Sequence, residues 1–250
     1  CNPKAKFKHF ADYYDRLMAE DINYSRIADY IENLFDRYDV NPKLIADLAC
    51  GTGNVTIPMS ERGYEMIGVD NSIQMLEVAR KKATEKNLDI LFLNQDIAKL
   101  DLFGTCDAFL CMIDGVNYIL QPKSLCNMFK RIKTCFLNPG GIFVFDISSF
   151  YKLSEFVGNN TFIHDGDDIF YAWENKYHPN MQISEMYLNF FVKEKKGYRR
   201  FCERHFQKAY KTEEIIKALK KAGFADVDCY DGLTFSKPKK DSKRVIFAAR

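Results

Sequence analysis

Short apolar runs alternate with amphipathic stretches through the middle of the chain. The apolar runs predict strands at 44–49, 65–69, 89–93, 107–112 and 141–147. The amphipathic stretches predict helices at about 54–62, 72–86 and 123–137. Strands and helices that alternate at this spacing predict parallel βαβ units, which use right-handed crossovers.

The two ends of the chain add helices and a closing hairpin. Residues 7–38 place large apolar side chains at helical spacing, which predicts two amphipathic helices broken near Asp21-Ile-Asn23. Further on, Thr212-Glu-Glu214 has a capping residue and an acidic first turn, and Ala222-Gly223 is typical of a helix end. Strands at 224–230 and 244–249 are expected to form a hairpin on the sheet edge.

The segment 150–207 has a different character. It contains period-two stretches such as Ser184-Glu-Met-Tyr-Leu-Asn-Phe190, and Lys195-Lys-Gly197 lies between two of them as a predicted hairpin turn. We therefore predict an α/β fold with a doubly wound, mostly parallel, Rossmann-like sheet. This sheet has seven strands with a C-terminal antiparallel hairpin, and the fold carries an antiparallel β insertion. The expected parts are a helical cap (1–43), a cofactor-binding core (44–149 and 208–250) and a β-rich substrate lid (150–207).

Composition fits a folded domain and sets few demands on partners. The 250 residues are 47% hydrophobic and 28% charged, with a formal net charge of +2, so the overall charge requires neither a nucleic acid nor a membrane. No apolar stretch reaches bilayer length, and the eight cysteines contain no CxxC pair. We expect a cytoplasmic protein without metal or membrane contact, as a monomer or weak dimer.

Glycines and acids follow the first two predicted strands. Asp47-Leu-Ala-Cys-Gly-Thr-Gly53 ends the first strand in a glycine-rich turn, and Asp70 ends the second. Gly51 and Gly53 permit a tight turn close to a ligand, and the free amides of the following helix favour an anionic group. Asp47 can accept a hydrogen bond from an ammonium group, and Asp70 can accept two from ribose hydroxyls.

A third acid, Asp96, follows the third strand, where it can accept from the exocyclic amine of adenine. Met75 and Ile97 offer apolar faces to the adenine ring. A dinucleotide fits less well, because a GxGxxG turn needs Gly or Ala where this chain has Thr56. Three acids at one sheet edge favour S-adenosylmethionine as the cofactor.

With these pieces the chain resembles class I S-adenosylmethionine-dependent methyltransferases, and small-molecule methyltransferases in particular. The matching segments, at about 40–150 and 210–250, are the glycine-rich turn above, Gly68-Val-Asp-Asn-Ser72, Gln95-Asp-Ile97, Cys111-Met-Ile-Asp114, Pro139-Gly-Gly141 and Ala222-Gly-Phe224. The resemblance implies that the cofactor is bound by Gly51, Gly53, Asp70 and Asp96, with Asn71 beside Asp70. Ala49 replaces the loop's first glycine, which is a mild departure.

The resemblance also implies a tyrosine that closes over the methionine end of the cofactor. Tyr13 and Tyr14 are the candidates, and packing of both against the core is the alternative. Methyl transfer from a sulfonium is an in-line displacement, so the protein must chiefly align the acceptor and exclude water.

Three other side chains are candidates for contact with the acceptor. Asp114 and Tyr118 follow the fourth strand, and His205 lies at the return of the insertion. A loop cap is the structural alternative for Asp114, and a hydrogen-bonded structural histidine is the alternative for His205. Trp173, with Tyr171 and Tyr177, could line a substrate pocket or pack the insertion's own core. The sequence does not decide between these two roles, substrate pocket and core packing.

The acceptor itself stays open. We expect N- or O-methylation of a small molecule, and the chain lacks the Asn/Asp-Pro-Pro-Tyr motif used for planar amine nitrogens. The basic stretch Lys237-Pro-Lys-Lys-Asp-Ser-Lys-Arg244 keeps an RNA methyltransferase as an alternative. A protein that binds the cofactor without catalysis is a third reading.

Overall fold

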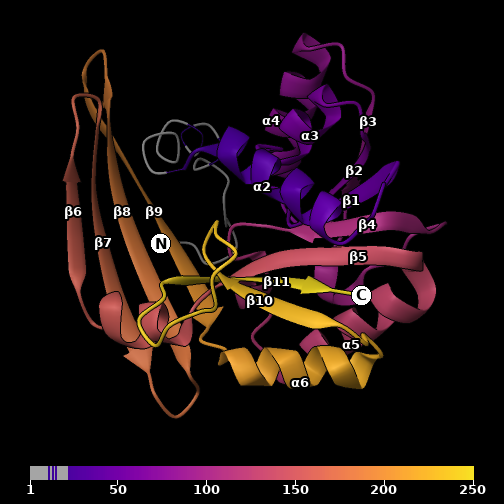
Figure 1. Cartoon of the computed structure of the whole chain (residues 1–250). Coiled ribbons are helices and arrows are strands. Elements are labelled where there is room, and N and C mark those ends of the chain that lie inside the picture. Colours follow the sequence, from indigo (N-terminus) through magenta and orange to yellow (C-terminus); the bar gives the residue numbers. More distant parts are fainter. Residues whose placement is uncertain (1–10, 12, 14, 16–21) are drawn as a thin grey trace.

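The computed structural model describes residues 11, 13, 15 and 22–250. Its larger sheet has seven strands in the order β10-β11-β5-β4-β1-β2-β3 (Figure 1). The strands are β1 (Leu44–Leu48), β2 (Glu65–Asp70), β3 (Ile90–Asn94), β4 (Cys106–Cys111), β5 (Leu137–Ser148), β10 (Val227–Asp231) and β11 (Arg244–Ala249). Strands β1 to β5 pair in parallel, whereas β11 is antiparallel to both β5 and β10. The predicted mostly parallel sheet with an antiparallel C-terminal hairpin is confirmed.

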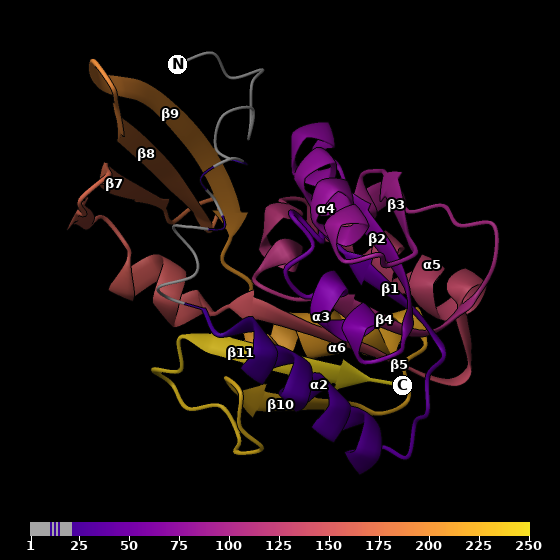
Figure 2. The same ribbon diagram turned by 90° about the horizontal axis from the view of Figure 1, so that it is seen from above.

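Helices cover both faces of this sheet (Figure 2). They are α2 (Tyr24–Arg37), α3 (Thr56–Glu61), α4 (Ile73–Glu85), α5 (Pro122–Arg131) and α6 (Thr212–Ala222). Successive side chains of a strand point to opposite faces. Accordingly Phe143 and Phe145 pack with the cluster of α5 and α6, whereas Val144 packs with the cluster of α2. The alternation within β5 therefore supplies both halves of the core.

Residues 161–208 form a separate four-stranded antiparallel sheet in the order β6-β7-β8-β9. Its strands are β6 (Thr161–Asp165), β7 (Ile169–His178), β8 (Ile183–Glu194) and β9 (Gly197–Lys208). The predicted hairpin at Lys195-Lys-Gly197 joins β8 to β9, and Gly197 has a φ of 114°. Figure 1 shows this sheet beside the larger one, with β9 nearest to it. The predicted antiparallel insertion is confirmed.

Short helical turns follow several strands: η1 (Ile97–Lys99), η2 (Gly115–Tyr118), η3 (Ile132–Phe136) and η4 (Lys152–Phe156). Two of the expected element boundaries were wrong: the end of one helix and the start of one strand. The helix expected at 123–137 ends at Arg131 and continues as the π-helical turn η3. Strand β5 then begins at Leu137, before the Pro-Gly-Gly turn, because residues 138–141 bulge out between the pairs Cys106–Leu137 and Ala108–Ile142.

The start of α6 also differs from the expectation. Thr212 is the first residue of the helix and not its cap. The capping position is Lys211, whose backbone N–H donates to Glu214 Oε2 at 2.9 Å. The acidic first turn therefore stabilises the helix start without a hydroxyl cap.

The described N-terminal residues connect the two sheets. The Tyr13 ring stacks on Phe201 of β9, with 5.7 Å between the ring centroids. Asp15 accepts hydrogen bonds from Asn54 Nδ2 at 2.8 Å and from Lys82 Nζ at 2.7 Å. This part of the chain thus lies between the four-stranded sheet and the glycine-rich turn.

Candidate active site

The strand order brings four loops to one edge of the larger sheet. Strands β1 and β4 are neighbours although two strands separate them in sequence, so the order reverses there. In open α/β sheets such a reversal opens a crevice at the carboxyl ends of the strands. A cavity of about 690 Å³ occupies this position and extends beneath the four-stranded sheet. It is lined by the ends of β1, β2 and β4 and by β7, β8 and β9.

The glycine-rich turn uses left-handed backbone at alternating positions. Ala49, Gly51 and Gly53 have φ values of 53°, 55° and 78°. A Cβ on Gly51 would meet nothing within 4 Å, whereas a Cβ on Gly53 would lie 3.3 Å from Ala79 of α4. Gly51 thus lines the cavity, and Gly53 lets the loop pack closely against a helix. Ala49, where the resemblance expects a glycine, adopts a conformation that glycine adopts at lower cost.

Asp70 is fixed at the floor of the cavity. Its Oδ2 accepts from the Gly51 N–H at 2.9 Å and its Oδ1 from the Ser72 N–H at 2.8 Å. Burial raises the pKa of Asp70, although the N–H groups of Ser72, Gly51 and Asn71 oppose this shift. Each carboxylate oxygen keeps a further lone pair, so the group can still accept from a diol. The carboxylate and the open Gly51 backbone fit a ribose-containing cofactor.

The other predicted adenosine contacts lie around the same cavity. Asn71, Met75, Asp96 and Ile97 all line it. Met75 and Ile97 are buried, whereas Asp96 is exposed and accepts from the Ala98 N–H at 2.9 Å. That bond leaves Asp96 Oδ2 without a partner in the described hydrogen bonds. The structure therefore brings an apolar surface and a free carboxylate oxygen together where adenine was predicted.

Asp47 lies behind the glycine-rich turn and not in the main cavity. It is 2% exposed, accepts from Thr56 Oγ1 at 2.6 Å, and borders a smaller cavity of about 50 Å³. Burial raises the pKa of Asp47 to about 7, and the charge of Asp70 adds to this, against the bond from Thr56. Ala49, Gly51 and Ile113 border both cavities. Thr56, whose size disfavours a dinucleotide, is therefore the residue that hydrogen-bonds to Asp47, the first of the three predicted acids.

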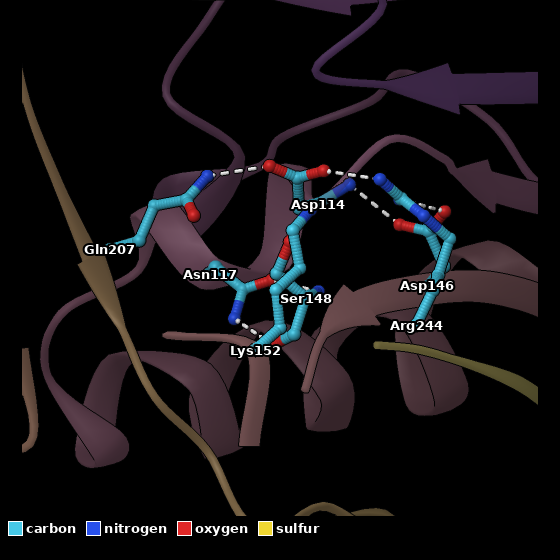
Figure 3. A network of polar contacts seen from close by, with 7 residues as sticks. All are labelled: Asp114, Asn117, Asp146, Ser148, Lys152, Gln207 and Arg244. Carbon is cyan, nitrogen blue, oxygen red and sulfur yellow. Dashed lines mark hydrogen bonds and ion pairs between the residues drawn. The ribbon is translucent and has the colours of Figure 1, made fainter. Parts of the chain in front are cut away.

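A network of charged groups forms the opposite wall of the cavity (Figure 3). Asp114 Oδ1 lies 3.0 Å from Arg244 Nη2, and Asp114 Oδ2 accepts from Gln207 Nε2 at 2.6 Å. Arg244 also pairs with the buried Asp146 at 2.5 Å. Burial alone would raise the pKa of Asp114, but the charges of Arg244 and Lys152 and the bond from Gln207 hold it below the usual value. Asp114 is therefore an ionised carboxylate at the cavity surface.

The backbone beside Asp114 is strained. Ile113 and Asp114 both have left-handed φ values, 61° and 54°, and such a φ is an outlier for a β-branched residue like isoleucine. Gly115 follows, and a Cβ there would lie 2.8 Å from Ala49 Cβ and 2.7 Å from Cys111 Sγ. The loop after β4 thus packs tightly onto the loop after β1. Strain of this kind is held by the surrounding structure and clusters at functional sites.

Tyr118 and His205 meet above this network. Tyr118 Oη lies 3.4 Å from His205 Nδ1, and the rings are perpendicular with 5.9 Å between centroids. Burial and the charge of Asp114 raise the pKa of Tyr118, so its hydroxyl stays protonated. The structure brings Asp114, Tyr118 and His205 together in one cavity. Tyr14 lies outside the described residues.

Three aromatic residues of β7 were considered for the substrate pocket, and they differ in whether they border the cavity. Tyr171 and Trp173 line the cavity, as predicted for a substrate pocket. Tyr177 instead packs against Phe150 in the small core beneath the four-stranded sheet. Tyr171 and Trp173 also pack against hydrophobic clusters, so all three residues have a packing role and two of them border the cavity as well.

Comparisons with known proteins agree with this geometry. Residues 45–141 match the family described as "Methyltransferase domain". The chain is 32% identical over 246 residues to the Bacillus subtilis protein named "Putative methyltransferase YqeM", which covers 98% of this chain and 96% of that protein. A crystal structure of an S-adenosylmethionine-dependent methyltransferase from Clostridium acetobutylicum superposes with a TM-score of 0.90, at 35% identity and 98% coverage of both chains. The chain belongs to the class I S-adenosylmethionine-dependent methyltransferases.

A second solved structure, of lower sequence identity, shares the fold. It is the sugar N-methyltransferase KedS8 from Streptoalloteichus, with a TM-score of 0.76 at 18% identity and coverage of 94% of this chain and 91% of that one. S-adenosylmethionine is the cofactor of this methyltransferase, as the glycine-rich turn and its three acids predicted. Among the residues that the structure describes, no helix is long and apolar enough to cross a membrane.

Three residues of this methyltransferase's cavity wall were not predicted from the sequence: Arg244, Gln207 and Lys152. In the sequence, Arg244 is the last residue of the basic stretch 237–244, but the hairpin places it between Asp114 and Asp146. Its position at the start of the apolar run Val245-Ile-Phe-Ala-Ala249 is a signal, because a charge entering a buried strand needs a partner. Gln207 carries no such signal, since its bond to Asp114 depends on how the two sheets meet; Lys152 bonds to Ser148, four residues earlier, and no apolar pattern marks it.

Proposed function

We propose that this methyltransferase transfers the methyl group of S-adenosylmethionine to a nitrogen or oxygen of a small polar molecule. The observation that supports it is the continuous cavity between Gly51, Asp70 and Asp96 on one side and Asp114 and His205 on the other. A volume of about 690 Å³ lies in the usual range for small-ligand sites. The four-stranded sheet would then act as the substrate lid. The sugar N-methyltransferase of the same fold is consistent with this class of acceptor.

The residues of the cavity would divide the work of the reaction. Asp70 would accept from the ribose hydroxyls, Asp96 would accept from the adenine amine, and Met75 and Ile97 would lie against the ring. The loop amides near Gly51 and the carboxylate of Asp47 would hold the charged groups of the methionine end. The bound cofactor supplies an activated methyl group, so the protein needs chiefly to place the acceptor atom in line with it.

Asp114 would orient the acceptor. An ionised carboxylate accepts a hydrogen bond from an amine or hydroxyl, which points the acceptor's lone pair away from Asp114. Arg244 and Gln207 fix the rotamer of Asp114 and keep it ionised. His205, next to Tyr118, would take the proton when the acceptor must lose one.

Calorimetry tests the cofactor half of this proposal. We expect wild type to bind S-adenosylhomocysteine, and Asp70→Ala to bind it at least about tenfold more weakly, because a charged hydrogen-bond acceptor is lost. Asp89→Ala, an exposed aspartate outside the cavity, is the matched control. Absence of binding to wild type would refute the proposal.

An isotope experiment tests the acceptor half. The enzyme is incubated with S-adenosylmethionine carrying a deuterated methyl group and with either a small-molecule extract or total RNA. We expect label in a small molecule, and about a hundredfold slower transfer by Asp114→Asn. Label in RNA, lost on charge reversal of Lys239 and Lys240, would favour the RNA alternative. Transfer to neither would favour a non-catalytic binding protein.

The positions of two residues of the basic stretch weaken the RNA alternative. Arg244 is inside the cavity wall, and Lys243 Nζ lies 3.5 Å above the centroid of the Phe156 ring. Two cations of the basic stretch therefore have partners within the protein. A cytoplasmic location and a monomeric or weakly dimeric state stay proposals from composition.

A further inference from the structure

The two cations of the cavity wall differ in their partners. Arg244 has a carboxylate oxygen at 3.0 Å from Asp114 and another at 2.5 Å from Asp146. Lys152 donates to Ser148 Oγ at 3.1 Å and has no carboxylate oxygen within 4.0 Å in the described part of the chain. Figure 3 shows the Lys152 side chain beside Ser148 and Asp114, while Arg244 joins the two aspartates.

Lys152 is held where its ammonium reaches the cavity. It is the first residue of η4, four positions after the last residue of β5, and its backbone N–H donates to Ser149 Oγ at 3.0 Å. Ser148 is itself fixed by Asn117, which accepts from its N–H at 2.9 Å and donates to its carbonyl at 3.0 Å. Both Lys152 and Ser148 line the cavity. An ammonium group has three donors, and Ser148 uses one of them.

A second donor without a partner belongs to Trp173, a residue that borders the same cavity. The indole Nε1 of Trp173 is buried and has no hydrogen-bond partner in the described structure. A buried N–H that stays unpaired costs free energy, and Trp173 can only donate. Lys152 lines the cavity and can only donate as well, so a ligand that binds its ammonium must bring lone pairs.

Charge favours an anionic ligand. Arg244 pairs with both Asp114 and Asp146, whereas Lys152 has no carboxylate oxygen within 4.0 Å in the described part of the chain. A partly buried ammonium without a close counterion is costly, and burial lowers the pKa of Lys152 although Asp114 opposes the shift. A single carboxylate on the acceptor would pair with the ammonium of Lys152 and supply the missing counterion.

We propose that Lys152 binds a carboxylate of the methyl acceptor. This inference rests on the proposed small-molecule function and narrows the substrate class to carboxylic acids that also carry an amine or hydroxyl for Asp114. Lys152 is then a specificity-determining residue, while Asp114 orients the reacting atom.

The test uses acetate as the probe and acetamide as its uncharged equivalent. Lysine labelled with ¹³C at Cε is followed by NMR in the protein loaded with S-adenosylhomocysteine, and Lys152→Arg identifies the Lys152 signal. We expect a saturable shift of that signal with acetate and none with acetamide. Because both variants lack that signal, their acetate binding is measured by calorimetry: Lys152→Met should bind acetate about tenfold or more weakly, since a charge-assisted bond is lost, and Lys152→Arg should keep binding.

Lys123→Met, at an exposed lysine of α5, is the matched control and should behave as wild type. The proposal is overturned if acetate and acetamide act alike, or if only inorganic phosphate binds. It is also overturned if Lys152→Met weakens binding of S-adenosylhomocysteine itself, since Lys152 would then contact the cofactor. The acetate titration is repeated without cofactor. Failure of wild type to bind S-adenosylhomocysteine would refute the proposed function, whereas binding of S-adenosylhomocysteine without an acetate shift at Lys152 would refute this inference alone.

Discussion

Arg244 Nη2 lies 3.0 Å from Asp114 Oδ1, although the two residues are 130 positions apart in the chain. The first begins the last strand and the second follows β4, so the ion pair forms only when the antiparallel hairpin docks on β5. The same guanidinium pairs with Asp146. Arg244 therefore links the completed sheet to the geometry of the cavity wall.

Removing this guanidinium should destabilise the fold. Arg244→Met leaves Asp114 and Asp146 buried without their cation, and we expect the free energy of unfolding to fall by about 3–5 kcal/mol at pH 7. Urea unfolding measures it. The double variant Arg244→Met with Asp114→Asn should recover part of the loss, because one of the two unpaired charges is gone. Strictly additive losses would contradict the pairing.

Stability should decline with pH because of Asp47. Its folded pKa of about 7 lies above the ordinary 3.8, so between about pH 4 and pH 7 the unfolded chain binds fewer protons than the folded one. Stability from Asp47 is therefore present below pH 4, is lost as pH rises to 7, and then stays level. Asp47→Asn should remove this decline and stabilise the protein at pH 8 by up to about 4 kcal/mol. This prediction would be contradicted if the difference in free energy of unfolding between wild type and Asp47→Asn did not change with pH.

The same variant should lose cofactor affinity. If the Asp47 carboxylate accepts from the ammonium of the methionine end, binding of S-adenosylhomocysteine to wild type strengthens as pH rises toward 7 and then levels off. Asp47→Asn should bind more weakly at pH 8 and should lack this pH dependence. Calorimetry at several pH values measures both. Equal affinity of the two proteins at pH 8 would show that Asp47 has a structural role alone.

The contact between the loops after β1 and β4 predicts a steric effect. A methyl group at Gly115 would meet Cys111 Sγ at 2.7 Å and Ala49 Cβ at 2.8 Å, so Gly115→Ala should destabilise the protein by about 1–3 kcal/mol. Gly104→Ala is the matched control, because nothing lies within 4 Å of its added Cβ. Thermal unfolding compares them. Equal midpoints for the two variants would count against this tight packing.

The cofactor half of the site was predictable because its residues are local to strand ends. Gly51, Asp70 and Asp96 each follow a strand whose apolar run is visible in the sequence, and parallel strands place their carboxyl ends at one edge. Thr56 was visible too, but its bond to Asp47 was not. A hydroxyl nine residues from a carboxylate gives no pattern by itself.

The acceptor half was only partly predictable. Asp114, Tyr118 and His205 were chosen by their place after β4 and at the return of the insertion, and they do meet in the cavity. Arg244, Gln207 and Lys152 come from β11, β9 and η4, and the contact of Gln207 with Asp114 depends on how the four-stranded sheet docks. No periodicity in the sequence specifies that docking.

The central claim is that one cavity places the sulfur of the cofactor before Asp114. A crystal structure of the complex with S-adenosylhomocysteine tests it most directly. We predict the ribose hydroxyls on Asp70, adenine between Met75 and Ile97, and the sulfur facing the space bounded by Asp114 and His205. A nucleoside bound elsewhere, or a sulfur that faces away from Asp114, would contradict the account.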